Sequence, residues 1–374
     1  MLDNRLVARR VVLAVGLTGG HIYPAKALAQ QLVKEQFQFL FVAGKNSSLA
    51  KTILEEEGYP LLPVEVCGMP RGPKEVFIRG FAFLWSQLKA CALLWRAFRD
   101  WKPALVVGFG SYVTPPAIIA AKILGIPTVI FEPNAKLGIA NGSLAWLCDK
   151  VVCAFDLPLG KAVLIEPPLR KSVLESAKLS KEACRESFGL SKDVPCVLIF
   201  GGSQGARAIN NAFGDALEHL RKENISFSFV HVTGAGDFEE TKSFYEAKRF
   251  LGGSGVVLSY LEDIAKAYQA ADLVVSRSGA MTCLELIHFK LPCVLIPLPH
   301  STESHQFANA KRLEDLGLAR VLQERDALSQ SLYQALKEIL SGGKQNLERQ
   351  VKLNTVTGKT FKQVVEELIG SDVR

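Results

Sequence analysis

One pattern that occurs twice limits the folds open to this chain of 374 residues. The apolar run VVLAV at 11–15 enters the glycine loop GLTGG at 16–20, and CVLIF at 196–200 enters GGSQG at 201–205. A short apolar strand followed by a glycine loop and a helix is typical of the first strand of a doubly wound parallel sheet. We therefore expect an α/β protein with two similar Rossmann-like domains and a central cleft.

Short apolar runs alternate with amphipathic stretches along the rest of the chain, as in parallel sheets covered by helices. We place strands near 11–16, 38–43, 104–109, 127–131, 150–154 and 163–166, and near 196–200, 226–232, 255–259, 272–276, 293–297 and 319–322. The paired prolines of EPPLR at 166–170 stop a strand and stiffen a connection. We therefore expect domains at 1–168 and 169–345, and a last helix in 346–374 that packs back onto the N-terminal domain.

The two glycine loops differ from the loop that binds dinucleotides. That loop reads GxGxxG, and an acidic residue ends the second strand. Here the loops read GLTGG and GGSQG, and the strands that follow them end FVAGK and HVTG. An NAD enzyme is therefore disfavoured, whereas a phosphate or a sugar can still approach the glycine backbone and the hydroxyl of Ser203. A tight turn without a ligand is the alternative.

The stretch DLVVSRSGAMTCLE at 272–285 combines a strand, a turn of small residues and a helix start. The unpaired N–H groups of the helix start and the positive end of its dipole favour a phosphate. Glu285 lies a turn further along, on the same face as Thr282, where a carboxylate suits sugar hydroxyls better than phosphate. Every parallel α/β protein has such junctions, so a purely structural role stays open.

Composition limits the partners without choosing among them. The net charge of +7 is compatible with nucleic acid, an anionic membrane surface or phosphorylated substrates. The eight cysteines form no CxxC pair and mostly sit in apolar runs, which predicts reduced core residues in a cytosolic protein. The first apolar run is interpreted as a strand and not as a signal peptide. No uncharged apolar run reaches the ~18 residues that a spanning helix needs.

The stretch 71–102 carries much of the positive charge. It holds seven basic and two acidic residues, and three of the four tryptophans. Basic residues near an anionic leaflet and aromatic rings at the interface favour a helix that lies on a membrane without spanning it. In this interpretation Phe81, Phe83 and Trp85 face lipid. The alternative is a core helix, because Leu88, Cys91, Leu94, Trp95 and Phe98 also follow helical core spacing.

The sequence predicts neither a metal site nor another cofactor. No Asp-x-Asp occurs, and His300 and His305 have no cysteine or carboxylate at ligand spacing. Backbone N–H groups and an arginine would then have to hold a diphosphate.

Six motifs, in order and spacing, resemble those of the MurG family: GLTGGH at 16–21, VVGFGSYVTPP at 106–116, FEPN at 131–134, GGSQGAR at 201–207, SRSGAMTCLE at 276–285 and HSTESHQFANA at 300–310. The resemblance implies the GT-B glycosyltransferase fold and inverting transfer of GlcNAc from UDP-GlcNAc to the 4-hydroxyl of the MurNAc-peptide of undecaprenyl-linked lipid I, giving lipid II. It further implies a peripheral place on the cytoplasmic face of the bacterial inner membrane. Other cell-wall synthesis proteins are expected as partners, and nucleic acid is not.

The resemblance also implies a donor site, position by position. It assigns contacts with UDP-GlcNAc to Thr18, Gly19, Gly20, Asn134, Arg170, Ser203, Leu261, Ala280, Met281, Thr282, Cys283, Leu284, Glu285 and Gln306. For catalysis it favours His21, directly after the glycines at a helix start, as the base that takes the proton of the incoming hydroxyl. Donation to the substrate or capping of the helix is the alternative role of His21.

The chain departs from the family's usual motifs at three places. Leu17 stiffens a loop that is usually all glycine, EPPLR replaces GNPVR but keeps Arg170, and Pro133 makes the assignment of Asn134 less direct because proline has no N–H. Two other functions stay open. One is a related transferase acting on another lipid, such as a diacylglycerol glucosyltransferase, and the other is a UDP-sugar-binding or epimerising protein of the same shape.

Overall fold

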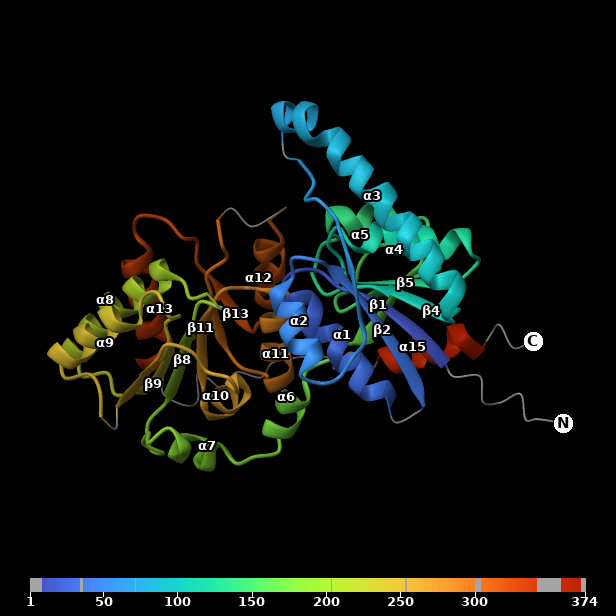
Figure 1. Cartoon of the computed structure of the whole chain (residues 1–374). Helices are drawn as coiled ribbons and strands as arrows, with labels where there is room; N and C mark the ends of the chain where they lie inside the picture. The colour runs from blue at the N-terminus through green and yellow to red at the C-terminus, as the bar shows by residue number, and fades with distance from the viewer. Residues whose placement is uncertain are drawn as a thin grey trace. The chain divides into compact units, whose positions relative to one another are not determined.

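The computed structural model describes residues 9–33, 36–70, 72–202, 204–252, 254–299, 304–341 and 358–370. The chain divides into two compact units (Figure 1). Unit 1 comprises 1–170 and 356–374, and unit 2 comprises 171–355. The sequence of unit 2 is therefore inserted into that of unit 1.

The described part of unit 1 forms an eight-stranded parallel sheet in the order β14-β7-β6-β5-β4-β1-β2-β3. Its strands are β1 (Arg9–Ala14), β2 (Phe37–Gly44), β3 (Leu61–Val64), β4 (Leu105–Gly108), β5 (Thr128–Glu132), β6 (Lys150–Cys153), β7 (Ala162–Glu166) and β14 (Lys359–Thr360). Its helices are α1 (Gly19–Leu32), α2 (Ser48–Glu55), α3 (Pro73–Trp101), α4 (Thr114–Ile123), α5 (Ile139–Leu144) and α15 (Phe361–Gly370).

The winding of unit 1 reverses at β1. The chain runs from β1 through β2 to β3 on one side and continues from β4 on the other, so β1 pairs with both β2 and β4. Its side chains alternate between two cores: Val12 and Ala14 join the cluster with α3 and α4, whereas Val11 and Leu13 are buried on the opposite side of the pleat. The carboxyl ends of β1 and β4 therefore meet at the switch point, where ligands of such sheets bind.

Helix α3 has 29 residues and spans about 43 Å. Pro73 occupies its first turn, and Lys102, in the left-handed conformation at φ +51°, ends it before Pro103. Its last part joins the core: Ala90, Leu94 and Phe98 recur every fourth residue and pack with α4. The first half projects beyond the sheet of unit 1 (Figure 1).

The described part of unit 2 forms a six-stranded parallel sheet in the order β10-β9-β8-β11-β12-β13. Its strands are β8 (Cys196–Phe200), β9 (Ser228–Val232), β10 (Gly255–Leu258), β11 (Leu273–Ser276), β12 (Cys293–Leu295) and β13 (Ala319–Val321). Its helices are α6 (Lys171–Ser176), α7 (Lys181–Ser187), α8 (Arg207–Lys222), α9 (Phe238–Ala247), α10 (Ile264–Ala270), α11 (Ala280–Phe289), α12 (His305–Asp315) and α13 (Leu328–Ser341).

Unit 2 repeats the winding of unit 1. The chain reverses at β8, which pairs with β9 on one side and β11 on the other. Side chains of α8 and α13 pack with alternate residues of β8, among them Val197 and Ile199, in one core, and α10 covers the other face. The second switch point therefore lies at the carboxyl ends of β8 and β11.

The expected doubly wound fold is confirmed, and each expected strand appears within two residues of its predicted ends. Two short edge strands, β3 and β14, had not been expected. The alternative of a core helix would bury Leu88 of α3, but this side chain is 63% exposed. Phe83, expected to face lipid, is half-buried and packs edge-on against Tyr112.

Candidate active site

The predicted contacts lie at the two switch points and in neighbouring segments of each unit. In unit 1, Thr18 ends the turn between β1 and α1, and Gly19 and Gly20 are the first two residues of α1. Thr18 is the residue before the helix, and its carbonyl accepts the first turn's bonds from the N–H groups of His21 and Ile22. The start of α1 therefore presents backbone N–H groups at the carboxyl edge of the sheet, as an anion site requires.

His21 lies in the first turn of α1 and packs against the neighbouring loop. Its Nδ1 lies 3.1 Å from Thr18 Oγ1. A Cβ atom on Gly16 would collide with the imidazole, and one on Gly110, whose φ is +92°, would lie 3.2 Å from Nε2. The ring is thus enclosed between the loops that follow β1 and β4. Burial lowers the pKa of His21 to about 4, so the imidazole is neutral at pH 7.

Arg170 lies in unit 1, next to α1. Its guanidinium packs over the ring of Tyr23, 5.2 Å from the ring centroid. Tyr23 in turn lies beside Gly19, where an added Cβ would be 2.9 Å from the ring. The structure therefore brings Arg170 to the side of the first glycine loop, where its charge adds to that of the helix start.

Asn134 follows β5 and is held by a buried carboxylate that the sequence reasoning did not single out. Glu132 is 1% exposed and accepts bonds from the backbone N–H and the side-chain amide of Asn134, at 3.0 and 2.8 Å. Its other oxygen accepts bonds from the Gly138 N–H and from Asn141 Nδ2. Glu132 therefore fixes the loop that presents Asn134. The sequence feature that could have indicated this role is a glutamate at the end of an apolar strand, two residues before Asn134.

In unit 2 the second glycine loop leads from β8 into α8. Ser203 lies outside the described residues. The described part of the loop folds back on itself, with the Gly205 N–H donating to the carbonyl of Gly202 at 3.0 Å. Gly202 and Gly205 have φ of +96° and +79°, which glycine adopts without strain. The loop therefore keeps its backbone close to the carboxyl end of β8.

The run 280–285 forms the first part of α11, with Gly279 as the preceding residue. Cys283 and Leu284 are buried, whereas Ala280, Met281 and Thr282 are half-exposed. Glu285 is 3% exposed, and its Oε2 accepts a bond from the hydroxyl of Tyr268 at 3.0 Å. Tyr268, which the sequence reasoning missed, thus orients the carboxylate of Glu285.

Gln306, on α12, lies next to the turn between β11 and α11. The hydroxyl of Ser278 donates to the backbone carbonyl of Gln306 at 2.7 Å, and Asn309 Nδ2 donates to the carbonyl of Ser278. The Gln306 side-chain oxygen accepts a bond from the Leu298 N–H at 2.9 Å. The amide nitrogen of Gln306 is therefore the part suited to donate to a sugar hydroxyl.

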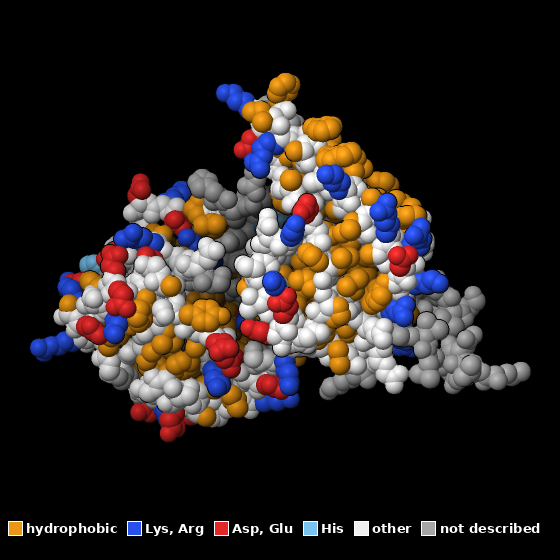
Figure 2. Space-filling model, in the orientation of Figure 1, with side chains coloured by type: hydrophobic (Ala, Val, Ile, Leu, Met, Phe, Trp, Pro, Cys, Tyr) orange, Lys and Arg blue, Asp and Glu red, His pale blue; other side chains and the backbone are white. Residues whose placement is uncertain are grey.

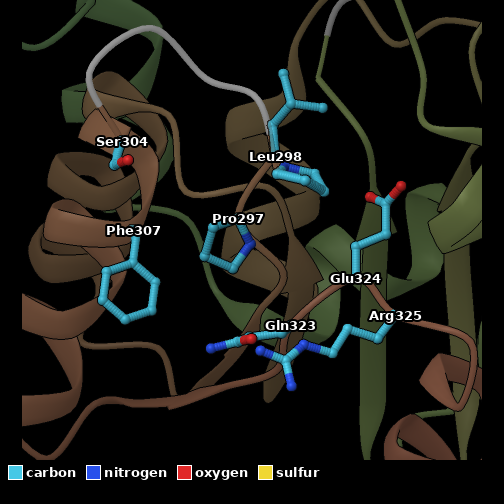
Figure 3. A pocket seen from close by; sticks show the side chains of 8 residues that line it. Pro297, Leu298, Ser304, Phe307, Gln323, Glu324 and Arg325 are labelled. Carbon is cyan, nitrogen blue, oxygen red and sulfur yellow. The ribbon is translucent and has the colours of Figure 1, made fainter.

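A pocket of about 270 Å³ lies beside this helix start. It is lined by 297–299, Ser304, Phe307 and 323–325, and Figure 3 shows the ring of Phe307 and the side chain of Arg325 on its wall. None of the predicted donor contacts lines it. Leu298 links it to Gln306 through the bond just described.

Leu261 lies just beyond β10, two strands from β8. The carbonyl of Leu258, at the end of β10, accepts a bond from the N–H of Thr233 at 3.0 Å. This carboxyl end is thereby tied to the segment after β9.

Among the residues that the structure describes, no group of three or more His, Cys, Asp or Glu side chains could hold a metal ion.

Comparison with known proteins agrees with this architecture. The model of the glycosyltransferase family 28 N-terminal domain matches 11–153, and that of the family 28 C-terminal domain matches 196–368. A glycosyltransferase of kitacinnamycin is 17% identical with a TM-score of 0.68, which shows a shared fold alone. Two doubly wound units with glycine loops at their switch points, matched by these models, define a family 28 glycosyltransferase of the GT-B fold.

Individual relatives indicate which kind of family 28 glycosyltransferase this chain resembles. The transferase of Myxococcus xanthus named UDP-N-acetylglucosamine–N-acetylmuramyl-(pentapeptide) pyrophosphoryl-undecaprenol N-acetylglucosamine transferase is 36% identical, covering 89% of this chain and 85% of its own. One of the same name from Desulforamulus reducens is 32% identical, covering 94% and 95%. The crystal structure of Acinetobacter baumannii MurG is 29% identical, with a TM-score of 0.77 over 97% of this chain and 99% of its own. The chain belongs to the MurG family.

Proposed function

We propose that this chain transfers GlcNAc from UDP-GlcNAc to the 4-hydroxyl of the muramyl sugar of lipid I, which gives lipid II. The observation that carries the proposal is identity of 32–36% over about nine tenths of the chain with transferases named for this reaction. The two glycine loops at the switch points support it, because a sugar nucleotide and a pyrophosphate-linked acceptor both bring phosphate to such loops.

The donor diphosphate would lie at the carboxyl ends of β8 and β11. The described part of the second glycine loop and the start of α11 would supply backbone N–H groups there. Glu285, oriented by Tyr268, would accept the ribose hydroxyls, and the backbone of Leu261 would pair with the edge of uracil. Thr282 and Gln306 complete the proposed contacts on α11 and α12.

His21 would act as the base of the transfer. When its Nδ1–H donates to Thr18 Oγ1, the lone pair of Nε2 is left to accept a proton. The acceptor's 4-hydroxyl oxygen attacks C1 of GlcNAc, its proton passes to Nε2, and the bond from C1 to the UDP oxygen breaks with inversion. Developing negative charge on UDP would be stabilised by N–H groups of the glycine loops and by Arg170.

The first half of α3 would dock on an anionic membrane surface. Its apolar side chains are largely exposed, with Phe77, Ile78 and Phe81 at 92%, 75% and 79%. Figure 2 shows hydrophobic side chains along this helix with lysines and arginines between them. Trp85 stacks on Phe81, and Lys89 lies over the Trp85 ring. Such a surface suits the interface between lipid tails and headgroups, where a lipid-linked acceptor is found.

Among the described residues, the segment Phe77–Trp101 of α3 is long and apolar enough to cross a membrane by length and composition. The sequence had predicted no such helix, because charged residues such as Arg79 and Lys89 interrupt the apolar runs of this segment. The end of α3 is packed in the core of unit 1 through Leu94 and Phe98. We therefore propose interfacial docking by the exposed side chains of α3, with its buried end held in unit 1.

The test is release of UDP from UDP-GlcNAc with a lipid-linked muramyl-peptide acceptor. Release should require the acceptor and yield a product heavier by one GlcNAc, detected by mass spectrometry. The same assay with diacylglycerol in place of the muramyl lipid tests the related-transferase alternative. Epimerised sugar nucleotide, or UDP release only with diacylglycerol, would contradict the proposal.

A further inference from the structure

A buried chain of hydrogen bonds runs through unit 2 behind the second glycine loop. The hydroxyl of Tyr245 on α9 lies 2.7 Å from His231 Nδ1, and His231 Nε2 lies 3.0 Å from Asn210 Oδ1. The amide nitrogen of Asn210 donates to the carbonyl of Thr233 at 3.0 Å and to Asp237 Oδ2 at 2.9 Å. Tyr245 and His231 are fully buried, and Asn210 is 2% exposed.

The donors and acceptors fit only one direction along this chain. Both hydrogens of the Asn210 amide are used on Thr233 and Asp237, so the atom facing His231 is the acceptor oxygen. His231 Nε2 must therefore carry the proton, and Nδ1 accepts from the Tyr245 hydroxyl. Burial lowers the pKa of His231 to about 3, which agrees with this neutral tautomer. Each side-chain nitrogen and oxygen from Tyr245 to Asn210 has a partner, which favours a single arrangement.

One end of the chain reaches the glycine loop. The carbonyl of Thr233, which Asn210 holds, lies directly against Gly205, where an added Cβ would collide with it. Gly234, at φ +85°, lies equally close, and a Cβ there would be 2.7 Å from the carbonyl oxygen of Gln204. The segment 233–234 is thus the surface against which 204–205 rests. A shift of the Thr233 carbonyl would shift the loop.

The same segment is tied to the end of β10. The N–H of Thr233 donates to the carbonyl of Leu258 at 3.0 Å, while the Thr233 hydroxyl lies 3.0 Å from the carbonyl of Gly234 and 3.3 Å from that of Leu258. Asn210 belongs to the first turns of α8, and its own N–H donates to the carbonyl of Ala206 at the end of the glycine loop. Asn210 therefore connects the loop's exit, the segment 233–234 and, through Thr233, the strand end that precedes Leu261.

We propose that Tyr245 and His231 are positioning residues for the donor: through Asn210 and Thr233 they fix the backbone of 204–205 and of 258–261 against which UDP binds. The proposal rests on the proposed function, which places the diphosphate and uracil at these two segments. In this proposal neither Tyr245 nor His231 contacts the donor. Their contribution is that the N–H groups are in place before UDP arrives, so that binding does not have to order them.

The experiment compares UDP affinity by calorimetry and steady-state constants in the full chain. His231→Phe keeps the ring volume but leaves Asn210 Oδ1 without its donor, and we expect the Kd of UDP and the KM of UDP-GlcNAc to rise about tenfold with kcat changed less than twofold. His231→Gln can supply an amide N–H near the position of Nε2, and it should restore most of the affinity.

The matched control is Phe229→Leu. Phe229 lies on β9 two residues before His231 and packs in the same core, against Tyr245 and Phe213, without a polar contact to the loop. It should lower stability and leave the Kd of UDP within twofold of wild type. Tyr245→Phe, which removes one hydroxyl, should raise the Kd about threefold and keeps the test decisive if His231→Phe does not fold.

Equal losses of UDP affinity in His231→Phe and Phe229→Leu would overturn the positioning role. Wild-type UDP affinity in both His231→Phe and Tyr245→Phe would overturn it as well. So would a failure of His231→Gln to bind UDP more tightly than His231→Phe. Failure of the proposed function would look different, because wild-type protein would then release no UDP with the muramyl lipid, whatever the UDP affinities of the variants.

Discussion

His21 shows how two loops set the protonation of one side chain. The loops after β1 and β4 enclose its ring, and burial lowers its pKa to about 4. The imidazole is therefore ready to accept a proton at neutral pH, although it is a weak base. Transfer to it becomes favourable only as the attacking hydroxyl becomes acidic, that is, as the bond to C1 forms.

His21→Ala should lower kcat about 100- to 10,000-fold and change the KM for UDP-GlcNAc little, because a base acts in the transition state. Steady-state kinetics with lipid I measures both. His219→Ala, in the last turn of α8, is the control and should keep wild-type values. Near-wild-type turnover of His21→Ala would leave the histidine a structural role.

Glu285 illustrates a carboxylate held ready for a ligand. Its side chain is buried and oriented by the Tyr268 hydroxyl, so little side-chain freedom remains to be lost when ribose binds. Bonds from two hydroxyls to a charged acceptor are stronger than those between neutral groups.

Glu285→Ala should weaken UDP binding by about 1.5 to 3 kcal/mol, measured by calorimetry, because the charge-assisted pair is lost. Glu285→Gln keeps the shape and an acceptor for Tyr268, so its loss should be smaller. Unchanged UDP affinity in folded Glu285→Ala would show that the carboxylate does not contact the nucleotide.

At the scale of elements, α3 and α15 differ in how much of their aromatic surface is buried. Helix α3 buries only its end and leaves Phe77 and Phe81 in solvent, whereas α15 places Phe361 between Phe109 and Phe131, with ring centroids at 6.0 and 5.4 Å. Exposed apolar surface of this kind indicates a partner, and buried aromatic contacts indicate a role in stability.

Changing Arg79, Lys89 and Arg96 of α3 to Glu together should weaken binding to vesicles that contain anionic lipid, because each basic residue near such a surface contributes about 1 kcal/mol. Vesicle sedimentation at two salt concentrations measures this. The charge-matched control changes the exposed Lys178, Lys266 and Lys290 of unit 2 to Glu. Wild-type binding with wild-type salt dependence in the α3 variant would place the membrane face elsewhere.

Phe361→Ala should lower the free energy of unfolding of unit 1 by about 3 to 5 kcal/mol, because a fully buried ring is removed. Tryptophan fluorescence during urea unfolding reports unit 1 alone, since Trp85, Trp95, Trp101 and Trp146 are the chain's four tryptophans. Phe361→Leu, which keeps most of the volume, should cost less. Equal unfolding midpoints for all three proteins would mean that α15 does not stabilise the unit.

At the scale of the whole molecule, unit 2 carries a fully buried histidine, His231, whose pKa is lowered to about 3 from its usual 6.5. In the unfolded chain this group takes up a proton as the pH falls below about 6.5, whereas in the folded chain it does not. Its contribution to stability is therefore complete above pH 6.5 and is lost as the pH falls.

Between pH 7 and 5, the unfolding of unit 2 should become easier, approaching about 1.4 kcal/mol per pH unit below pH 6.5 from this group. Urea unfolding followed by circular dichroism measures it, with the tryptophan signal of unit 1 recorded in parallel. In His231→Gln the dependence should be weaker, because the titrating group is gone. The same slope in both proteins would assign the acid sensitivity to other groups.

The sequence predicted the sheets well because their central strands are continuous apolar runs followed by glycine. It missed β3 and β14, which are edge strands: β3 contains Pro63, whose missing N–H is tolerated at an edge, and β14 has two polar residues. Burial along α3 could not be read from periodicity, because apolar residues surround its first half and Leu88 fits the core spacing without a helix to cover it.

The sequence predicted which segments form the candidate site, but not the contacts that hold their residues in place. The glycine loops and the start of α11 follow from local sequence. Glu132 and Tyr268 hold the expected residues Asn134 and Glu285, and His231 holds Asn210 behind the second glycine loop, through bonds that the sequence reasoning did not single out. The bond from Tyr268 to Glu285 spans 17 residues, and that from His231 to Asn210 spans 21. Only the folded sheet, with its strand order, brings such pairs together.

The insertion of unit 2 into unit 1 has a consequence for synthesis on the ribosome. Residues 1–170 leave first, yet Phe361 and the strand β14 that complete their sheet and core are made almost last. Until then, the newly made N-terminal segment has Phe109 and Phe131 without the ring that covers them. Unit 2 is contiguous and can fold while it emerges. The fold of unit 2 can therefore be completed before that of unit 1, although the synthesis of unit 1 begins first.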